Sequence, residues 1–149
     1  MNQHTYLRAY MAGVAFPTAF YLVGVIIFFI FSAIWGAPAL MERVIVFPVA
    51  VIPNVFGLWN MLFQKLHAHW SVPIGLHGAA LPFFLVPLGA AFAFSFGFLE
   101  LTSRGLLYFG FVYIPYWYLA IAPFIAITVY YLIWKYVVGW LNRILGLAY

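Results

Sequence analysis

Three of the four histidines lie within one short polar stretch, at His67, His69 and His77. Imidazole nitrogens bind zinc, copper, iron and nickel, and three of them can hold a metal ion with one coordination position open. The chain has no cysteine, and its two acidic residues, Glu42 and Glu100, are predicted on the opposite membrane face. We therefore interpret the histidines as an interfacial turn and predict no metal and no cofactor there. A transition metal or a haem held at this turn is the alternative.

The polar residues do not assemble into a catalytic set. Paired-carboxylate catalysis needs two neighbouring acids, and a Ser-His-Asp triad needs an acid beside a histidine. Neither arrangement fits two glutamates that are predicted far from the histidines, and no glycine motif of the Walker type is present. We therefore predict no catalytic residues, and an enzyme is the less favoured interpretation.

The composition is that of a membrane protein. Hydrophobic residues make up 68% of the chain, charged residues 5%, and the mean hydropathy is +1.11. Soluble domains carry about 25% charged residues, so this chain cannot give a folded core a water-soluble surface. We predict a polytopic integral membrane protein whose partners are lipids and other membrane subunits or itself. The formal charge of +4 is spread thinly, which excludes the clustered basic face that nucleic-acid binding requires.

Charged residues divide the sequence into four long uncharged intervals. The intervals lie between Arg8 and Glu42, Arg43 and Lys65, Lys65 and Glu100, and Arg104 and Lys135. Each interval is long enough for a transmembrane helix of about 20 residues. We predict an all-α fold, a four-transmembrane-helix bundle with short loops that forms a single domain over residues 1–149. The predicted helices cover residues 17–35, 44–63, 79–99 and 116–138.

The basic residues predict the orientation of the chain. Lysine and arginine favour the cytoplasmic side of a membrane. In the four-span arrangement, Arg43 and Arg104 lie on one side. The termini and the histidine turn share the other side with Arg8, Lys65, Lys135 and Arg143. Both termini and the turn are therefore predicted to be cytoplasmic.

Two predicted spans contain paired prolines, Pro48 and Pro53 in the second span and Pro82 and Pro87 in the third. A proline inside a helix removes one backbone hydrogen bond and usually kinks the helix. In lipid the freed carbonyl needs another partner, and the neighbouring Asn54 amide could supply one. We interpret these residues as kinked packing positions; a kink that gates a pathway is the alternative.

Three small residues four positions apart, Gly89, Ala93 and Gly97, are predicted on one face of the third span. Small residues at this spacing let two helix backbones approach closely in a membrane. We therefore predict a tight helix–helix contact at this face. Two other pairs of small residues could form the partner ridge, namely Ala122 with Ala126 and Ala15 with Ala19.

These features favour a small non-catalytic membrane protein, an accessory or structural subunit or a homo-oligomer that packs against partner proteins and lipids. The sequence shows no catalytic set, no ionisable residue inside a predicted span and little mass outside the membrane. One alternative is a small transporter or channel for a neutral or lipophilic solute, suggested by the kinked spans around Asn54. A second alternative is a metal- or haem-dependent membrane enzyme at the histidine turn.

Overall fold

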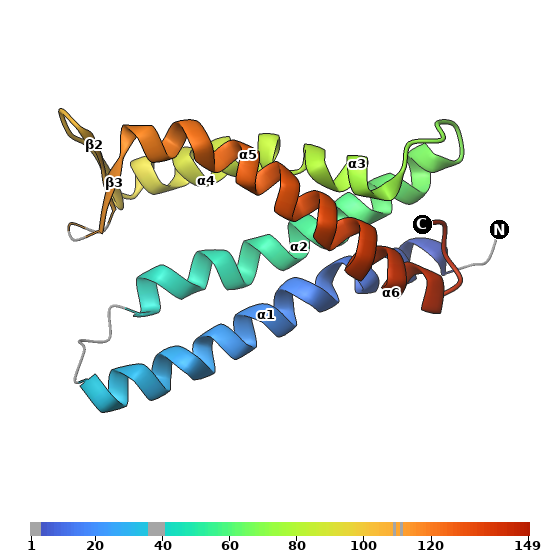
Figure 1. Ribbon diagram of the computed structural model, residues 1–149. Helices are drawn as coiled ribbons and strands as arrows, with labels where there is room; N and C mark the ends of the chain where they lie inside the picture. The colour runs from blue at the N-terminus through green and yellow to red at the C-terminus, as the bar shows by residue number, and fades with distance from the viewer. Residues whose placement is uncertain (1–3, 36–40, 109, 111) are drawn as a thin grey trace. The chain divides into compact units, whose positions relative to one another are not determined.

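The chain is mostly helical, and Figure 1 shows the computed structural model, in which helices account for 75% of the residues. The structure describes residues 4–35, 41–108, 110 and 112–149, and it describes their side chains except at 28, 31, 32, 35 and 41–50. The chain divides into two compact units, one comprising Met1–Val72 with Tyr136–Tyr149 and the other Pro73–Lys135. The predicted helical character is thus confirmed, and each unit is described by itself below.

The first unit is built on two long helices, α1 (Thr5–Trp35) and α2 (Met41–His67), which pack against each other. The short helix α6 (Gly139–Ile144) belongs to the same unit and contacts α1. Buried positions on α1 and α2 recur every three or four residues, which is the spacing of one helix face. They are Ala9, Ala12, Gly13 and Pro17 on α1, and Pro53, Phe56, Gly57, Asn60 and Phe63 on α2.

The contact between α1 and α2 depends on Gly13. A Cβ atom at this position would lie 2.8 Å from the Cα of Gly57 and closer still to the carbonyl oxygen of Phe56. A residue without a side chain lets the two backbones come this near, which is the small-residue packing typical of membrane helices. A close contact of the kind predicted for the third span is therefore observed between α1 and α2.

Three helices form most of the second unit, namely α3 (Ile74–Ala80), α4 (Pro82–Ser95) and α5 (Tyr116–Leu132). A one-residue break separates α3 from α4, because Pro82 has no N–H to continue the hydrogen bonding and begins a new first turn. Pro87 lies inside α4. The segment predicted as one helix from residue 79 is therefore two helices, and the first of them begins earlier, at Ile74.

The two glycines of α3 leave room for two aromatic side chains, one in the last turn of α5 and one just after it. A Cβ atom at Gly75 would lie 2.7 Å from the ring of Tyr131, and one at Gly78 would overlap Trp134. These two glycines are three residues apart and therefore face the same side of α3. The short helix packs closely on this end of α5 as a result.

A three-stranded antiparallel sheet connects α4 to α5, in the order β1 (Leu99–Leu101), β2 (Gly105–Tyr108) and β3 (Val112–Pro115). The helix α4 ends at Ser95, and two residues later Gly97 has a left-handed φ of 68°. The Phe98 N–H donates to the carbonyl of Ala93 at 2.7 Å, which closes a Schellman motif around that glycine. The predicted third helix, residues 79–99, is therefore wrong at its C-terminal end, and its last residue lies in β1.

A π-helical segment, η1 (Ile133–Val138), follows α5 directly and leads into α6. Its wider turn is uncommon in proteins and appears mostly as a short bulge inside an α-helix. Trp134 and Val138 within it are fully buried. The predicted fourth helix, residues 116–138, corresponds to α5 and η1 together.

Among the residues that the structure describes, three helical stretches are long and apolar enough to cross a membrane, namely Thr5–Ile27, Ile74–Ser95 and Tyr116–Ile144. The first predicted span began at Pro17, but α1 starts at Thr5 and holds this proline in its interior. The second predicted span, residues 44–63, lies within α2, which is longer at both ends. Over the part of the chain that the structure describes, α2 is not among the three stretches.

Candidate functional site

Two of the predicted histidines lie at the C-terminal end of α2 and in the turn that follows it. His67 is the last residue of the helix, and its ring packs against Phe63 with centroids 5.1 Å apart. The Nδ1 atom of His67 is buried and has no hydrogen-bond partner among the described residues. His69 is exposed in the following turn, with Nδ1 3.3 Å from the carbonyl oxygen of Lys65. Of this pair, His67 is the one with a buried ring nitrogen that no described residue hydrogen-bonds.

The third histidine, His77, lies in α3 of the second unit and is 8% exposed. Its ring meets Trp134 edge-on, with centroids 5.8 Å apart, so it belongs to the packing of α3 in that unit. The predicted polar turn, residues 64–78, is shorter than expected, because residues 64–67 complete α2 and residues 74–78 belong to α3. Among the residues with described positions, no three histidine or acidic side chains form a group that could hold a metal ion.

Two fully buried asparagines, Asn60 on α2 and Asn142 on α6, form a reciprocal amide pair. Asn60 Nδ2 donates to Asn142 Oδ1 at 2.7 Å, and Asn142 Nδ2 donates to Asn60 Oδ1 at 3.1 Å. Each Nδ2 also donates to a backbone carbonyl, Asn60 to Ala9 at 2.8 Å and Asn142 to Ala148 at 3.1 Å. All four amide hydrogens are bonded, which offsets the desolvation cost of burying two amides in apolar surroundings.

Gln64 extends this amide cluster to the residues that follow α6. Its Nε2 donates to the Ala148 carbonyl at 2.8 Å, and its Oε1 accepts from the Ala148 N–H at 3.2 Å. The chain reaches this position because Gly146, with a φ of 66°, reverses its direction. The Leu147 N–H then donates to the Asn142 carbonyl at 2.9 Å. The residues after α6 are therefore held against α2 by side-chain amides.

The sequence contains a signal for this cluster that histidine-centred reasoning missed. Asn60, Gln64 and His67 are spaced four and three residues apart, so they share one face of α2. Three polar residues on one face of a helix in such an apolar chain indicate a polar contact with another segment. The segment that hydrogen-bonds to Asn60 and Gln64 is distant in the sequence, and the spacing of its own polar residues shows no matching pattern.

Of the predicted kink residues of the second span, Asn54 makes a contact with α1. The Tyr10 hydroxyl on α1 donates a hydrogen bond to Asn54 Oδ1. The adjacent Pro53 is buried. Pro48 lies within α2, but its side chain is outside the described residues. These placements favour the packing interpretation of Asn54, and a pathway gated by the kink stays a prediction.

The predicted small-residue face of the third span makes no close contact at its first position. A Cβ atom at Gly89 would meet no described atom within 4 Å. Gly97 follows the end of α4 and is not part of the helix face at all. Gly89 and Ala93 remain on α4, so a tight contact there stays a prediction for a partner outside this chain.

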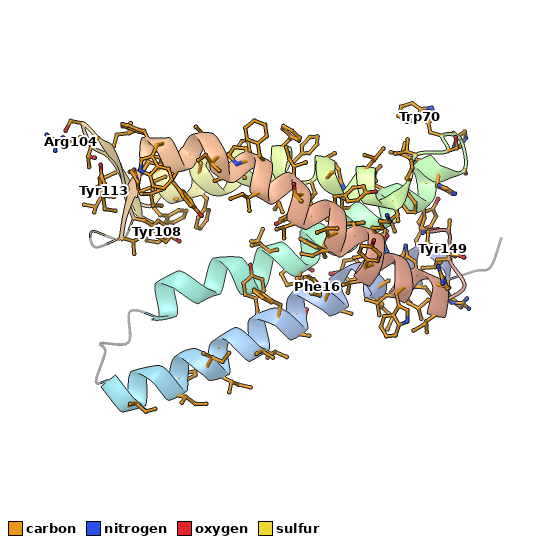
Figure 2. All side chains as sticks on the ribbon, in the orientation of Figure 1. Phe16, Trp70, Arg104, Tyr108, Tyr113 and Tyr149 are labelled. Atoms are coloured by element: carbon orange, nitrogen blue, oxygen red, sulfur yellow. The ribbon has the colours of Figure 1, made fainter. Side chains whose placement is uncertain are left out.

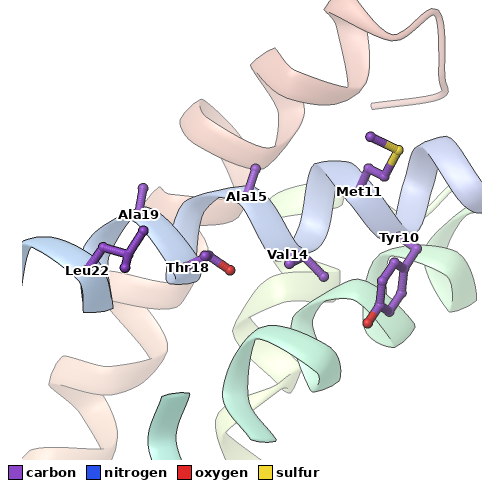
Figure 3. Close-up of a pocket in the computed structure, with 7 residues that line it drawn as sticks. All are labelled: Tyr10, Met11, Val14, Ala15, Thr18, Ala19 and Leu22. Atoms are coloured by element: carbon purple, nitrogen blue, oxygen red, sulfur yellow. The ribbon is translucent and has the colours of Figure 1, made fainter. Parts of the chain in front are cut away.

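An open apolar groove of about 370 Å³ runs along α1 (Figure 3). Its lining comes from one helix and consists of Tyr10, Met11, Val14, Ala15, Thr18, Ala19 and Leu22. In Figure 3, Met11, Ala15 and Ala19 project from the same side of the helix. The alanines are exposed, and their short side chains give the groove its depth between the longer ones.

No known family model, curated protein or solved structure matches the chain. Its chemistry therefore follows from its own groups. The amide cluster is neutral and its donors are bonded, which suits it to holding segments together. His67 has one buried ring nitrogen without a hydrogen-bond partner among the described residues, and the groove on α1 is an apolar surface that suits a helix or a lipid chain.

Proposed function

We propose that the chain is a small, non-catalytic integral membrane subunit that packs against other membrane proteins or copies of itself and against lipid. The helix α5 supports this proposal, because none of its 17 residues is buried. Phe124 and Trp117 on this helix are 72% and 66% exposed. Large apolar surfaces of this kind are stable in contact with lipid tails or with another apolar surface.

The observation that carries the proposal is the groove on α1. Ala15 and Ala19 are four residues apart and exposed, which is the spacing at which membrane helices approach closely. The same helix already uses Gly13 for a close contact with α2. α1 thus has one small-residue face that is occupied and a second one that is open to another helix.

Cysteine cross-linking in native membranes tests the groove, and the chain has no native cysteine to interfere. Oxidation of an Ala15→Cys variant should give a disulfide-linked dimer or a link to a partner. Helices packed at small residues bring Cα atoms within the roughly 4.4–6.8 Å that a disulfide spans. Phe20→Cys is the matched control, because this residue is 64% exposed but is absent from the groove lining. Two variants that both stay monomeric in the membrane would contradict the proposal.

We also propose that α2 is the second of four spans and that both termini are cytoplasmic. With 27 residues, α2 is about 40 Å long at 1.5 Å per residue, enough for a hydrocarbon core of about 30 Å. It packs against α1, which contains a candidate span. Its buried Asn60 has hydrogen-bond partners inside the unit, which lowers the free-energy cost of placing this amide in a bilayer.

A second candidate function, a metal- or haem-dependent activity, is favoured by the buried Nδ1 atom of His67. Its test is an optical spectrum and an elemental analysis of the protein purified from native membranes. A bound metal or haem should be lost from His67→Gln and retained by His69→Gln, since His69 is exposed. Equal retention by the two variants would exclude His67 as the ligand.

Transport of a neutral or lipophilic solute is the remaining alternative. The proline-kinked second and third spans around Asn54 are the feature that suggests it. Because the Asn54 side chain accepts a hydrogen bond from Tyr10 at the α1–α2 contact, we rank transport below the packing role.

A further inference from the structure

The sheet between α4 and α5 has two chemically different faces. Residues directly opposite one another in an antiparallel pair project from the same face, so the strand register assigns every side chain. One face, here named the apolar sheet face, carries Leu99, Leu101, Leu106, Tyr108, Val112 and Ile114. The other, named the outer sheet face, carries Glu100, Leu107, Tyr113 and Pro115, the last of these opposite Gly105.

The apolar sheet face is turned towards the helices of its own unit. Leu99, on this face, is 9% exposed where β1 packs on the end of α4. Figure 2 shows Tyr108 on the helix side of the strands, with Tyr113 and Arg104 on the outer side. Burial also raises the pKa of the Tyr108 phenol, as expected for a ring in apolar surroundings.

The helices cover only part of the apolar sheet face. Leu101 is 71% exposed and Val112 is 41% exposed. Each square ångström of apolar surface left in water forgoes about 25 cal/mol of stabilisation, so these side chains are more stable beside an apolar neighbour. On the outer side, Glu100 and Arg104 are exposed and carry charge, which favours water or lipid headgroups.

The position of the sheet in the chain identifies that neighbour. The candidate span Ile74–Ser95 has 22 residues and is about 33 Å long, which matches a hydrocarbon core of about 30 Å. The strand β1 begins shortly after this span ends, and β3 runs directly into the next candidate span at Tyr116. With both candidate spans across the bilayer, as proposed above, each end of the sheet is attached at the bilayer surface.

The direction of the strands is consistent with this placement. Figure 1 shows them running across, rather than along, the direction of α4 and α5 at this end of the unit. The exposed aromatic residues Tyr116, Trp117 and Tyr118 lie where the chain enters α5. Tyrosine and tryptophan are enriched at the level of lipid headgroups, which marks this junction as interfacial.

We infer that the three-stranded sheet is an interfacial lipid-binding element. It lies on the bilayer surface with the uncovered part of the apolar sheet face against the glycerol and upper acyl region of the lipids. The outer sheet face, with Glu100 and nearby Arg104, faces water. This inference rests on the membrane location in the proposed function and adds a lipid contact outside the spanning helices.

Fluorescence quenching in proteoliposomes tests the inference. Single cysteines replace Leu101 and Glu100, which are adjacent on β1 but project from opposite faces, and each is labelled with an environment-sensitive nitrobenzoxadiazole dye. The vesicles are phosphatidylcholine containing a lipid with a doxyl quencher near its carbonyl, and iodide is the aqueous quencher. The Leu101 label should emit at shorter wavelength and lose more fluorescence to the doxyl lipid. The Glu100 label should lose more to iodide.

Three outcomes would overturn the inference. The two labels could be quenched alike, the Leu101 label could be quenched mainly by iodide, or it could be shielded from both quenchers by a second protein. Val112→Cys provides a second site on the apolar sheet face if Leu101→Cys does not fold. Phe124→Cys on α5 is the internal control: if its label is quenched by the doxyl lipid while the Leu101 label is aqueous, the sheet inference alone fails.

Discussion

At the residue scale, side-chain amides link separate segments of the first unit, as charged pairs often do in soluble proteins. Asn60 and Asn142 each donate twice and accept once, so the pair has one favourable geometry. In an apolar environment an amide without partners costs several kcal/mol, roughly 2–7 by transfer measurements. The pair therefore sets which residues of α2 meet α6, in addition to stabilising the contact.

Replacing Asn60 with alanine should lower the free energy of unfolding by about 1–3 kcal/mol, because the buried carbonyl of Ala9 and the amide of Asn142 lose a partner. The measurement is SDS titration of the protein in mild detergent. The double variant Asn60→Ala/Asn142→Ala should be destabilised by less than the sum of the two single effects. Additive effects would show that the two amides do not interact in solution.

Gly13 and Gly24 offer a matched comparison within α1. A Cβ atom at Gly13 would meet the α2 backbone, whereas one at Gly24 would meet nothing within 4 Å among the described atoms. Gly13→Ala should therefore destabilise the protein by about 1–3 kcal/mol through overpacking. Gly24→Ala should be neutral or stabilising by up to about 1 kcal/mol, because alanine is the better helix former.

Thermal or SDS unfolding of the two alanine variants under identical detergent conditions measures the difference. If Gly13→Ala is as stable as Gly24→Ala, the α1–α2 contact in the membrane is looser than the structure shows.

The comparison of these two glycines also explains what the sequence could predict about close helix contacts. Small-residue spacing indicates where a close contact is possible, but it does not distinguish Gly13, which is used within the chain, from Gly89, which is open.

At the element scale, the helices could be predicted from composition, and their ends could not. Long uncharged runs predict helices because lipid leaves no other way to satisfy the backbone. Prolines predict helix boundaries or kinks, yet Pro17 lies inside α1 while Pro82 begins α4. The true end of α4 is set by Gly97, because glycine adopts the left-handed conformation without strain.

The sheet was absent from the predictions for a physical reason. Its strands are three or four residues long, too short for an alternating pattern to stand out. They are also stabilised by each other and by the helix ends rather than by local propensity. The amide cluster was missed similarly, since Asn142 and Ala148 meet Gln64 and Asn60 only after the chain has folded.

At the scale of the whole molecule, the four-span arrangement makes a direct prediction about Ser71 and Ser103. Both are exposed, one in the turn after α2 and the other in the turn between β1 and β2. Single cysteines at these positions should react with a membrane-impermeant maleimide from opposite sides of the membrane. Labelling of Ser71→Cys in intact cytoplasm-side-out vesicles, with Ser103→Cys protected, is the expected result.

The unlabelled wild-type protein is the control for this experiment, because it contains no cysteine. Vesicles opened with detergent should label both variants equally and establish that each thiol is reactive. Reaction of both variants from one side of sealed vesicles would contradict the four-span proposal. That result would concern the topology alone and would not contradict the contacts described inside each unit.

The length of α1 has a consequence for the membrane itself. The helix has 31 residues, about 46 Å at 1.5 Å per residue, which exceeds a hydrocarbon core of about 30 Å. No charged residue follows Arg8 within it, so in the proposed membrane topology we expect its long apolar run to be accommodated by tilt. Since α2 is packed against α1 at Gly13, a change in tilt moves both helices together. In that topology we expect thick, sterol-rich bilayers to hold the pair closer to the membrane normal and thin bilayers to tilt it further, so its orientation would follow bilayer thickness.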